Sequence, residues 1–377
     1  MRTVRHLLIF SIIFLSYSCS QNNQTKQKEG ISSIKEIEIN EVTKEEIPDI
    51  MILNSFIPLS NKIPLAPIKR VLIYKERIYI LDDQPKIVCF NMKGDILFKI
   101  DCKGAGPTEY LSIKDFAIDD KSERIVTLDH EKRKLFFYDL NTGKHLSNIS
   151  TMHMAPTEMG VIHGCFFFKN IDRRFDIQKK QMFYLLYSKN GKQIDKMFLP
   201  HDAVADFNFD LNSFFYNDNS LLFIKPFDNI VYLLAKERIT PIFKISLPNP
   251  LPIEKIEEKI KHTEMPTSGY AYGIDNIYTT ESMLHFTFTK DGYIVSVFFD
   301  LITERLLYSG IRVLGNSRKQ LPFYSLIDGV YKGKFYALVS ASSIVERKTV
   351  QAEPFINNEL LKTKEDDNPI LAFFTFK

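Results

Sequence analysis

Residues Arg77 to Gly94 (RIYILDDQPKIVCFNMKG) and Arg124 to Gly143 (RIVTLDHEKRKLFFYDLNTG) share one layout. Each segment begins with an apolar run that ends at an aspartate, Asp82 or Asp129, and then crosses a polar turn into a second apolar run and a turn ending in glycine. The two aspartates are 47 residues apart. Apolar, β-branched runs bounded by Gly, Asn and Asp predict short strands joined by tight turns. The two segments therefore indicate an internal repeat built from strands.

The same spacing continues along the chain. Gly94 and Gly143 are 49 residues apart, and Gly191 follows after another 48. Looser copies of the pattern occupy residues 221–247, 284–309 and 334–340. A period of roughly 40–50 residues with several strands per unit is typical of a β-propeller. We predict an all-β fold, a six-bladed β-propeller, although roughly 330 residues after the N-terminal segments also allow seven tight blades.

Composition agrees with a folded body rich in strands. The chain has 377 residues, of which 45% are hydrophobic and 25% charged, which excludes a disordered, collagen-like or polytopic membrane protein. It contains 31 Phe and 17 Tyr but no Trp. In a propeller these aromatic side chains would fill the spaces between blades. The lack of Trp counts mildly against a platform for stacking sugars.

The charge balance excludes one class of partner. Lys and Arg number 49 and Asp and Glu 46, a net charge of +3. Removal of residues 1–18 would take away two arginines and no acid, leaving 47 against 46. A dense basic face is needed to bind nucleic acid, so we expect no nucleic-acid partner.

The N-terminus has the layout of an export signal. Arg2 and Arg5 precede an apolar run from Leu7 to Leu15 that is too short to span a bilayer. The segment Leu15 to Cys19 (LSYSC) resembles the lipobox of bacterial lipoproteins, although Ser16 stands where that pattern prefers Leu. The resemblance implies that Cys19 is acylated and anchors the protein in a lipid bilayer. The alternative is a simple cleaved signal.

These features divide the chain into three parts. We predict a signal peptide over residues 1–18, a lipid-anchored tether and lead-in over 19–45, and the propeller over 46–377. The stretch Ser20 to Gly30 is polar and reads as flexible. The expected location is the periplasm or the outer-membrane surface.

Three further cysteines remain, Cys89, Cys102 and Cys165. A hairpin turn at residues 91–95 would leave Cys89 and Cys102 several residues out of register. We therefore favour buried free thiols over a disulfide.

Several segments carry a family resemblance. They are residues 57–59, 68–82, 86–94, 104–110, 113–119, 227–232, 331–338 and 367–377. Together they resemble the six-bladed β-propeller lipoproteins of Bacteroidota, within the NHL/TolB-like propeller superfamily, over nearly the whole mature chain. The most specific piece is Gly104 to Tyr110 (GAGPTEY), where the family usually has GKGPGEY and this chain has Ala105 and Thr108. Because that family is largely uncharacterised, the resemblance implies fold and location more than function.

The GAGPTEY segment is the first candidate binding loop. A phosphate cradle needs successive backbone N–H groups at a helix start, whereas Pro107 has none and a strand pattern resumes at residue 113. We favour a tight turn between blades, with Gly104 and Gly106 giving backbone freedom and Glu109 and Tyr110 bonding locally. Contact of these four residues with a ligand is the alternative.

Tyr270 and Tyr272, in the segment TSGYAYG, are the second candidate binding residues. We interpret them as loop tyrosines available for exposed contacts, with a packed loop as the alternative. Residues 252–262 place isoleucines at helical spacing and predict a short amphipathic helix.

Catalytic and metal motifs are missing from the sequence. The eight histidines show no HExxH pattern, and no Gly-x-Ser-x-Gly segment occurs. Ligands of an axial metal would come from successive blades, so Asp82, Asp129 and Asp139 are candidates, but we favour a role in closing turns. We predict no cofactor and no catalytic residue.

Two functions follow from these observations. The first is a non-catalytic envelope lipoprotein whose propeller binds a protein or glycan partner. The second is a propeller enzyme, a hydrolase or lyase with an axial metal site. Convergence of three or more metal-ligating side chains at the centre of the ring would favour the enzyme.

Overall fold

Short antiparallel strands make up almost all of the regular structure. The coordinates are a computed structural model, and they describe residues 34–45, 47, 50–151, 156–170, 183–200, 211–252, 254–255, 268–311, 327–348 and 360–377. The chain divides into one unit over residues 1–33 and a second over residues 34–377. The predicted signal peptide and Cys19 lie in the first unit, outside the described residues.

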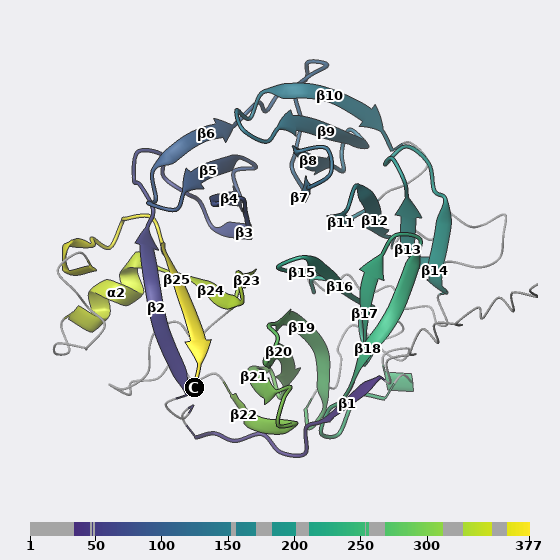
Figure 1. Cartoon of the computed structure of the whole chain (residues 1–377), viewed down its shortest axis with the longest axis vertical. Coiled ribbons are helices and arrows are strands. Elements are labelled where there is room, and N and C mark those ends of the chain that lie inside the picture. Colours follow the sequence, from purple (N-terminus) through teal and green to yellow (C-terminus); the bar gives the residue numbers. More distant parts are fainter. Residues whose placement is uncertain are drawn as a thin grey trace, which may run out of the picture. The chain divides into compact units, whose positions relative to one another are not determined.

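The first repeat forms a four-stranded sheet. Its strands are β3 (Ile68–Tyr74), β4 (Arg77–Asp82), β5 (Ile87–Asn91) and β6 (Ile96–Ile100), each antiparallel to the next. The central strands β4 and β5 are buried on both faces, whereas exposed and half-buried residues alternate along most of β6. The first strand is therefore innermost and the fourth lies at the rim (Figure 1).

Three other sheets have the same strand order along the chain. They are β7 (Asp115–Asp119), β8 (Arg124–Asp129), β9 (Lys134–Asp139) and β10 (His145–Ser150); β11 (Glu158–Ile162), β12 (Cys165–Lys169), β13 (Phe183–Ser188) and β14 (Lys196–Pro200); and β19 (Ala271–Thr279), β20 (Met283–Lys290), β21 (Tyr293–Asp300) and β22 (Arg305–Ile311). The predicted repeat of strands is confirmed by this succession.

The remaining strands form one nine-stranded sheet in the order β1-β18-β17-β16-β15-β23-β24-β25-β2. The strands are β1 (Lys35–Glu38), β2 (Met51–Pro58), β15 (Phe214–Asn217), β16 (Ser220–Ile224), β17 (Ile230–Ala235), β18 (Arg238–Ser246), β23 (Gly329–Tyr331), β24 (Lys334–Val339) and β25 (Ile370–Phe376). The first strand, β1, pairs in parallel with β18, and β2 pairs antiparallel with the last strand, β25. Pairing of β2 with β25 joins the N-terminal and C-terminal parts of the propeller.

The sheets of this unit surround a common centre (Figure 1). Their first strands contact one another in the closed sequence β3, β7, β11, β15, β19, β23 and back to β3. Radial sheets whose inner strands close a circle define a propeller-type, all-β fold. Of the described helices, none is both long and apolar enough to cross a membrane.

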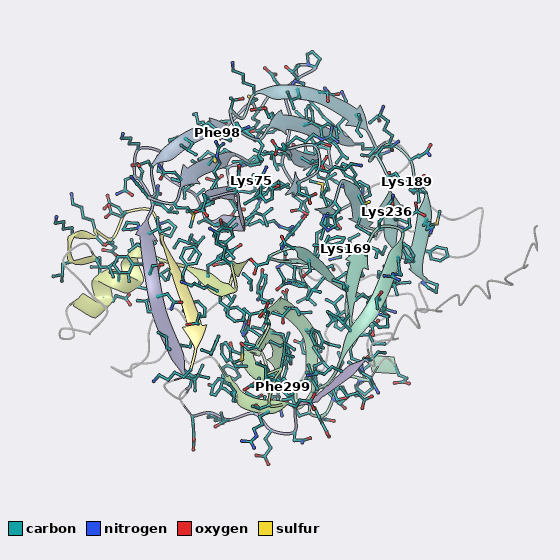
Figure 2. The ribbon with its side chains drawn as sticks, viewed as in Figure 1. Lys75, Phe98, Lys169, Lys189, Lys236 and Phe299 are labelled. Carbon is teal, nitrogen blue, oxygen red and sulfur yellow. The ribbon has the colours of Figure 1, made fainter. Side chains whose placement is uncertain are left out.

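Apolar clusters fill the spaces between neighbouring sheets (Figure 2). On β9, Phe136 and Tyr138 belong to the cluster shared with the preceding sheet, whereas Phe137 belongs to the cluster shared with the following one. Successive side chains of a strand point to opposite faces, so a strand between two sheets buries both sets. The fully buried Phe and Tyr side chains include Tyr79, Phe116 and Phe166. The aromatic excess therefore serves packing between sheets, as the composition predicted.

The regularly spaced glycines occupy equivalent turns. Gly94, Gly143 and Gly191 each lie between the third and fourth strands of a sheet, with φ of 82°, 67° and 76°. A side chain is disfavoured in this left-handed region. At Gly94 a Cβ atom would also lie 1.9 Å from the carbonyl oxygen of Pro58 in β2. Glycine there lets the turn pack directly against the rim of the neighbouring sheet.

The helical content differs from the prediction. Of the predicted helix over residues 252–262, Glu254 and Lys255 are helical, and most of the segment lies outside the described residues. The structure instead has α2 (Ala341–Lys348) and a short 3-10 helix, η3 (Leu360–Lys362), between β24 and β25. Ile344 and Leu360 anchor these helices through a small apolar cluster. The sequence pattern did not reveal this insertion.

All three described cysteines are free thiols. Cys89 and Cys165 are buried, as predicted, but Cys102 is exposed, so the expectation of a buried thiol is wrong there. Cys102 follows the end of rim strand β6, where only one side of the chain is covered. Cys89 pairs across the sheet with Phe98, which agrees with the predicted lack of register between the two cysteines.

Candidate functional site

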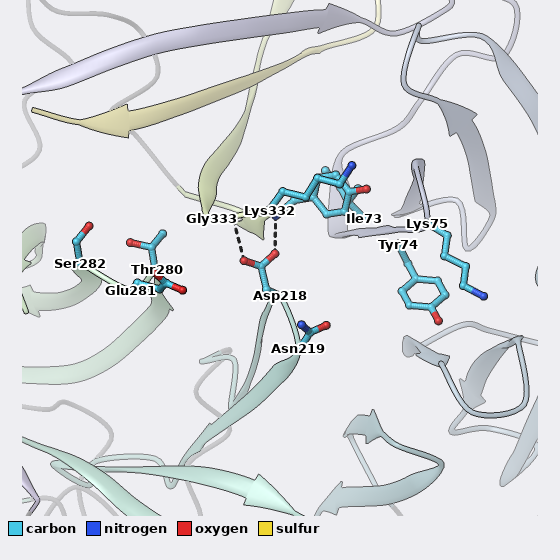
Figure 3. Close-up of a pocket in the computed structure, with 11 residues that line it drawn as sticks. Ile73, Tyr74, Lys75, Asp218, Asn219, Thr280, Glu281, Ser282, Lys332 and Gly333 are labelled. Carbon is cyan, nitrogen blue, oxygen red and sulfur yellow. Dashed lines mark hydrogen bonds between the residues drawn. The ribbon is translucent and has the colours of Figure 1, made fainter.

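One end of the ring is formed by the turns that join each first strand to its second strand. Turns from β3–β4, β15–β16, β19–β20 and β23–β24 enclose a cavity of about 670 Å³ there (Figure 3). We call this cavity the mouth. Its lining includes Tyr74, Lys75, Asp218, Asn219, Thr280, Glu281, Ser282, Tyr331 and Lys332. Residues from distant parts of the chain meet here because every sheet begins its hairpin at the same end.

Charged side chains tie the turns of the mouth together. The carboxylate of Asp218 accepts the backbone N–H of Lys332 at 2.5 Å and that of Gly333 at 2.8 Å (Figure 3). Lys332 also forms an ion pair with Glu76, and the Tyr331 hydroxyl donates to Glu76 at 3.0 Å. Hydrogen bonds from Lys332 and Tyr331 lower the pKa of Glu76. These contacts hold β3–β4, β15–β16 and β23–β24 turns in fixed relative positions.

Three other polar side chains that line the mouth have no partner among the described residues. Within the described part of the chain, the side chains of Asn219, Glu281 and Ser282 make no hydrogen bond or ion pair. All three residues are exposed. The mouth thus combines a fixed frame with unsatisfied carboxylate, amide and hydroxyl groups, and these can bind a polar ligand.

Further along the inner strands, the centre of the ring carries buried charges. Arg70 of β3 pairs with Asp115 of β7 through Nε and Oδ1 at 3.1 Å. Lys169 pairs with Glu158 at 2.5 Å, and Glu158 also accepts the backbone N–H of Ser213 at 2.8 Å. Each pair neutralises charges that would be costly to bury alone.

Three buried carboxyl groups are shifted toward the neutral form. Burial raises the pKa of Asp275 to about 7 and that of Asp328 to about 7. Burial also raises the pKa of Asp115 to about 6, and the Arg70 charge opposes part of this shift. The centre of the ring is therefore polar, close to neutral in charge, and titrates near physiological pH.

The GAGPTEY loop is at the other end of the sheets, since it joins the end of β6 to the start of β7. The Gly106 N–H donates to Glu109 Oε2 at 2.8 Å, and Gly104 N–H donates to the Tyr110 carbonyl at 2.9 Å. Lys132 Nζ donates to the carbonyls of Gly104, Gly106 and Glu109 at 3.0, 2.9 and 2.5 Å. Tyr110 is buried. The loop's polar groups are thus largely used within the protein, and the structure does not bring them to the mouth.

The two candidate tyrosines are half-buried. Tyr272 lies in β19 rather than in a loop, and its ring stacks on Phe227 with centroids 6.4 Å apart. Tyr270 precedes β19, and Lys255 Nζ lies 5.7 Å from its ring. Tyr272 lines a small pocket of about 140 Å³, but neither residue lines the mouth.

The candidate aspartates close turns. Asp82 pairs with Lys86 at 2.6 Å and accepts the Ala66 N–H, and Asp129 accepts the Leu111 N–H at 2.7 Å. Asp139 accepts hydrogen bonds from Thr142, which lower its pKa. In the described ranges no group of three or more His, Cys, Asp or Glu side chains could hold a metal ion.

Sequence reasoning missed the residues of the mouth and the ring centre. Lys75, Asp218 and Lys332 resemble ordinary turn residues, and Arg70 and Asp115 resemble ordinary charged positions near the ends of mostly apolar strands. The available signal was a charged residue inside a mostly apolar strand, such as Arg70 in IKRVLIY.

The fold and these contacts define a propeller-type, all-β protein with a polar mouth. The protein family described as "Domain of unknown function (DUF4934)" matches residues 56–375, and the chain belongs to this family. A search of the curated proteins found no match.

Two solved structures share the fold. A Bacteroides fragilis protein assigned as exported is 17% identical, with a TM-score of 0.75 over 91% of this chain and 100% of that chain. A member of the DUF4221 family from Bacteroides vulgatus is 10% identical, with a TM-score of 0.52 over 87% of this chain and 98% of that chain. At these identities the likeness concerns the fold alone.

Proposed function

We propose that this chain is an exported, lipid-anchored envelope protein with a non-catalytic six-bladed propeller that binds a protein partner through the mouth. The observation that carries the proposal is the cavity of about 670 Å³, whose frame is fixed by Asp218 and Lys332 and whose Asn219 and Glu281 side chains are free among the described residues. Lysine and acidic groups line it together, which suits a polar loop carrying both signs of charge.

The six-bladed count rests on how the nine-stranded sheet divides. A single parallel pair, Asn217 with Val330, links β15 to β23. Each side of that link holds its own antiparallel series, β15 to β18 and β23 to β25 completed by β2. Apolar clusters lie between β15–β18 and β19–β22 and between β19–β22 and β23–β25, as they do between the four-stranded sheets. Two blades that touch at their inner strands account for these features.

Crosslinking from defined positions tests the mouth. A photoreactive amino acid at Asn219 or Glu281 of the full-length protein in native membranes should give a discrete crosslinked product. Protease should digest the crosslinked partner. The same group at Ile302, which is 73% exposed on the β21–β22 turn, serves as the control. Equal crosslinking from Ile302, or none from the mouth, would reject the proposal. A product that resists protease but yields to glycosidases would assign a glycan instead.

The anchor is tested separately. Metabolic labelling with an alkyne fatty acid should mark the wild-type protein. On detergent phase separation, the wild-type protein should enter the detergent phase. Cys19→Ala should lose both properties while the folded domain persists. Release of unlabelled wild-type protein in soluble form would support a simple cleaved signal and contradict the lipid anchor.

A further inference from the structure

A second and smaller cavity lies between the inner strands. It has a volume of about 70 Å³, and its lining includes Arg70, Tyr216, Tyr278, Asp328 and Tyr336. These residues come from β3, β15, β19, the segment before β23, and β24. A water needs roughly 10–15 Å³ of such space, so the cavity has room for several waters or for one small polar molecule.

Arg70 brings an incompletely satisfied cation to this cavity. Its Nε pairs with Asp115, but Nη1 is buried without a partner among the described residues. The oxygens of Asp115 are also engaged by the backbone N–H groups of Phe116 and Met159, each at 2.8 Å. A buried donor without an acceptor is unfavourable, and more so when it carries charge. Arg70 Nη1 therefore lacks an acceptor among the described residues.

Two tyrosines add hydroxyl donors. The Tyr216 oxygen accepts the Val161 N–H at 2.9 Å, so its own proton is still available. The Tyr278 hydroxyl makes no hydrogen bond within the described residues, whereas the Tyr336 hydroxyl donates to the Val71 carbonyl at 3.2 Å and is already used. Burial raises the pKa of Tyr216 and Tyr278, and the nearby Arg70 charge opposes this effect in both. The Arg70 guanidinium and the hydroxyls of Tyr216 and Tyr278 thus belong to residues that line one small cavity.

Asp328 is the acid that faces this cavity. Its Oδ2 accepts the Leu338 N–H at 2.6 Å, and burial raises its pKa to about 7. The groups that interact with it electrostatically are Tyr278 from β19 and Tyr336 from β24, and Arg70 from β3 lines the same cavity. Below pH 7 Asp328 is mostly protonated and becomes a further donor. Lys69, which also pairs with Asp83 at 3.1 Å, lines the cavity as well, so its charged lining consists of two cations and one acid.

We propose that this cavity binds a small anion of carboxylate chemistry, the size of formate or acetate, between the Arg70 guanidinium and the hydroxyls of Tyr216 and Tyr278. A carboxylate offers several acceptor positions and matches the planar guanidinium. The site is distinct from the mouth, so the test of this proposal does not depend on partner binding at the mouth.

Titration of the full-length protein with formate and acetate tests the site. Heat of binding and thermal stability are measured at constant ionic strength, with gluconate, a much bulkier carboxylate, as the balancing anion. Saturable binding with a rise in melting temperature is expected for formate and acetate. Equal effects from gluconate, or no saturable binding, would overturn the proposal.

Matched tyrosine variants locate the binding. Tyr278→Phe removes an unpaired hydroxyl and should weaken formate binding about tenfold or more, as expected for loss of one hydrogen bond to a charged group. Tyr336→Phe removes a hydroxyl already bonded to Val71 and should leave the affinity within about twofold. Both variants keep the ring, so both should fold. Equal affinity in the two variants would contradict the assignment.

The pH dependence gives a second readout. Formate should bind more weakly at pH 8 than at pH 6, because ionised Asp328 repels it. Asp275, which interacts electrostatically with Tyr278, has a pKa raised to about 7, and Asp115, which pairs with Arg70, has one raised to about 6, so some pH dependence should persist without Asp328. The decrease in affinity should therefore be smaller in Asp328→Asn than in the wild type. Tighter binding at pH 8 in the wild type would overturn the proposal.

Discussion

The spaces between sheets and the centre of the ring are both buried, yet they are built from opposite chemistry. Between sheets, residues such as Phe136 and Phe166 interdigitate as apolar clusters. At the centre, Arg70, Asp115 and Asp328 are buried with polar partners. Large apolar side chains fill the spaces between neighbouring sheets, whereas the innermost residues surround a narrow space that water can share. Apolar packing is therefore concentrated between the sheets, and titratable groups are concentrated at the centre.

The largest expected effect comes from emptying a space between sheets. Phe136 is fully buried between β7–β10 and the preceding sheet, so Phe136→Ala should lower the free energy of unfolding by about 3–5 kcal/mol. Leu146 of β10, which is 55% exposed, is the control, and Leu146→Ala should change stability by about 0.5 kcal/mol or less. Urea unfolding followed by circular dichroism measures both. Equal losses would show that the interface is not the main source of stability.

Removing a charge at the centre should raise the stability of the protein at pH 8, whereas Phe136→Ala lowers it. Because the pKa of folded Asp328 is about 7, above its ordinary 3.8, the stability it contributes is complete below pH 4 and is lost as pH rises through 7. Asp328→Asn keeps an acceptor for the Leu338 N–H and carries no charge. The variant should be more stable than the wild type at pH 8 by about 2–4 kcal/mol and nearly equal to it at pH 4. A loss of stability at pH 8 would indicate that the ionised form is paired.

Two glycines allow the stability cost of backbone strain to be distinguished from the cost of a steric contact between sheets. Gly94 and Gly292 have φ of 82° and 80°, but a Cβ at Gly94 meets Pro58, whereas none lies within 4 Å at Gly292. Gly292→Ala should cost about 1 kcal/mol from the left-handed conformation alone. Gly94→Ala should cost about 1–3 kcal/mol more, because the turn must move away from β2. Equal costs in thermal unfolding would contradict a close contact at Gly94.

The smallest effect is expected in the GAGPTEY loop. A Cβ at Gly106 would lie 2.9 Å from Glu109 Oε2, the atom that accepts the Gly106 N–H. Gly106→Val should displace this flexible carboxylate and lower stability by about 1–2 kcal/mol. Partner crosslinking from the mouth should be unchanged. Loss of crosslinking in a variant with wild-type stability would instead assign the loop to binding.

Some features of the fold could be predicted from the sequence. The spacing of Gly94, Gly143 and Gly191 predicted equivalent turns, and the excess of Phe and Tyr predicted aromatic packing between blades. Asp82 and Asp129 were correctly interpreted as turn residues. These features are local, since they depend on backbone conformation and on the two-residue period of a strand.

Other features needed the assembled ring. Tyr272 entered a strand and Cys102 reached solvent, because the exact end of a strand depends on pairing with neighbours. The helix α2 is held by contacts between Ile344 and Leu360, which are 16 residues apart. No pattern within one repeat distinguishes a rim strand from an inner strand until the neighbouring sheets are placed.

The sequence alone determined that this protein is a repeated, all-β chain with aromatic packing between its units, because strand periodicity and turn chemistry act over a few residues. Only the tertiary structure decided which polar residues meet. Lys75, Asp218, Glu281 and Lys332 are separated by up to 257 residues and yet line one mouth, and Arg70 faces Tyr278 across a cavity. Closure of the ring brings them together, since it places one end of every inner strand around the same axis.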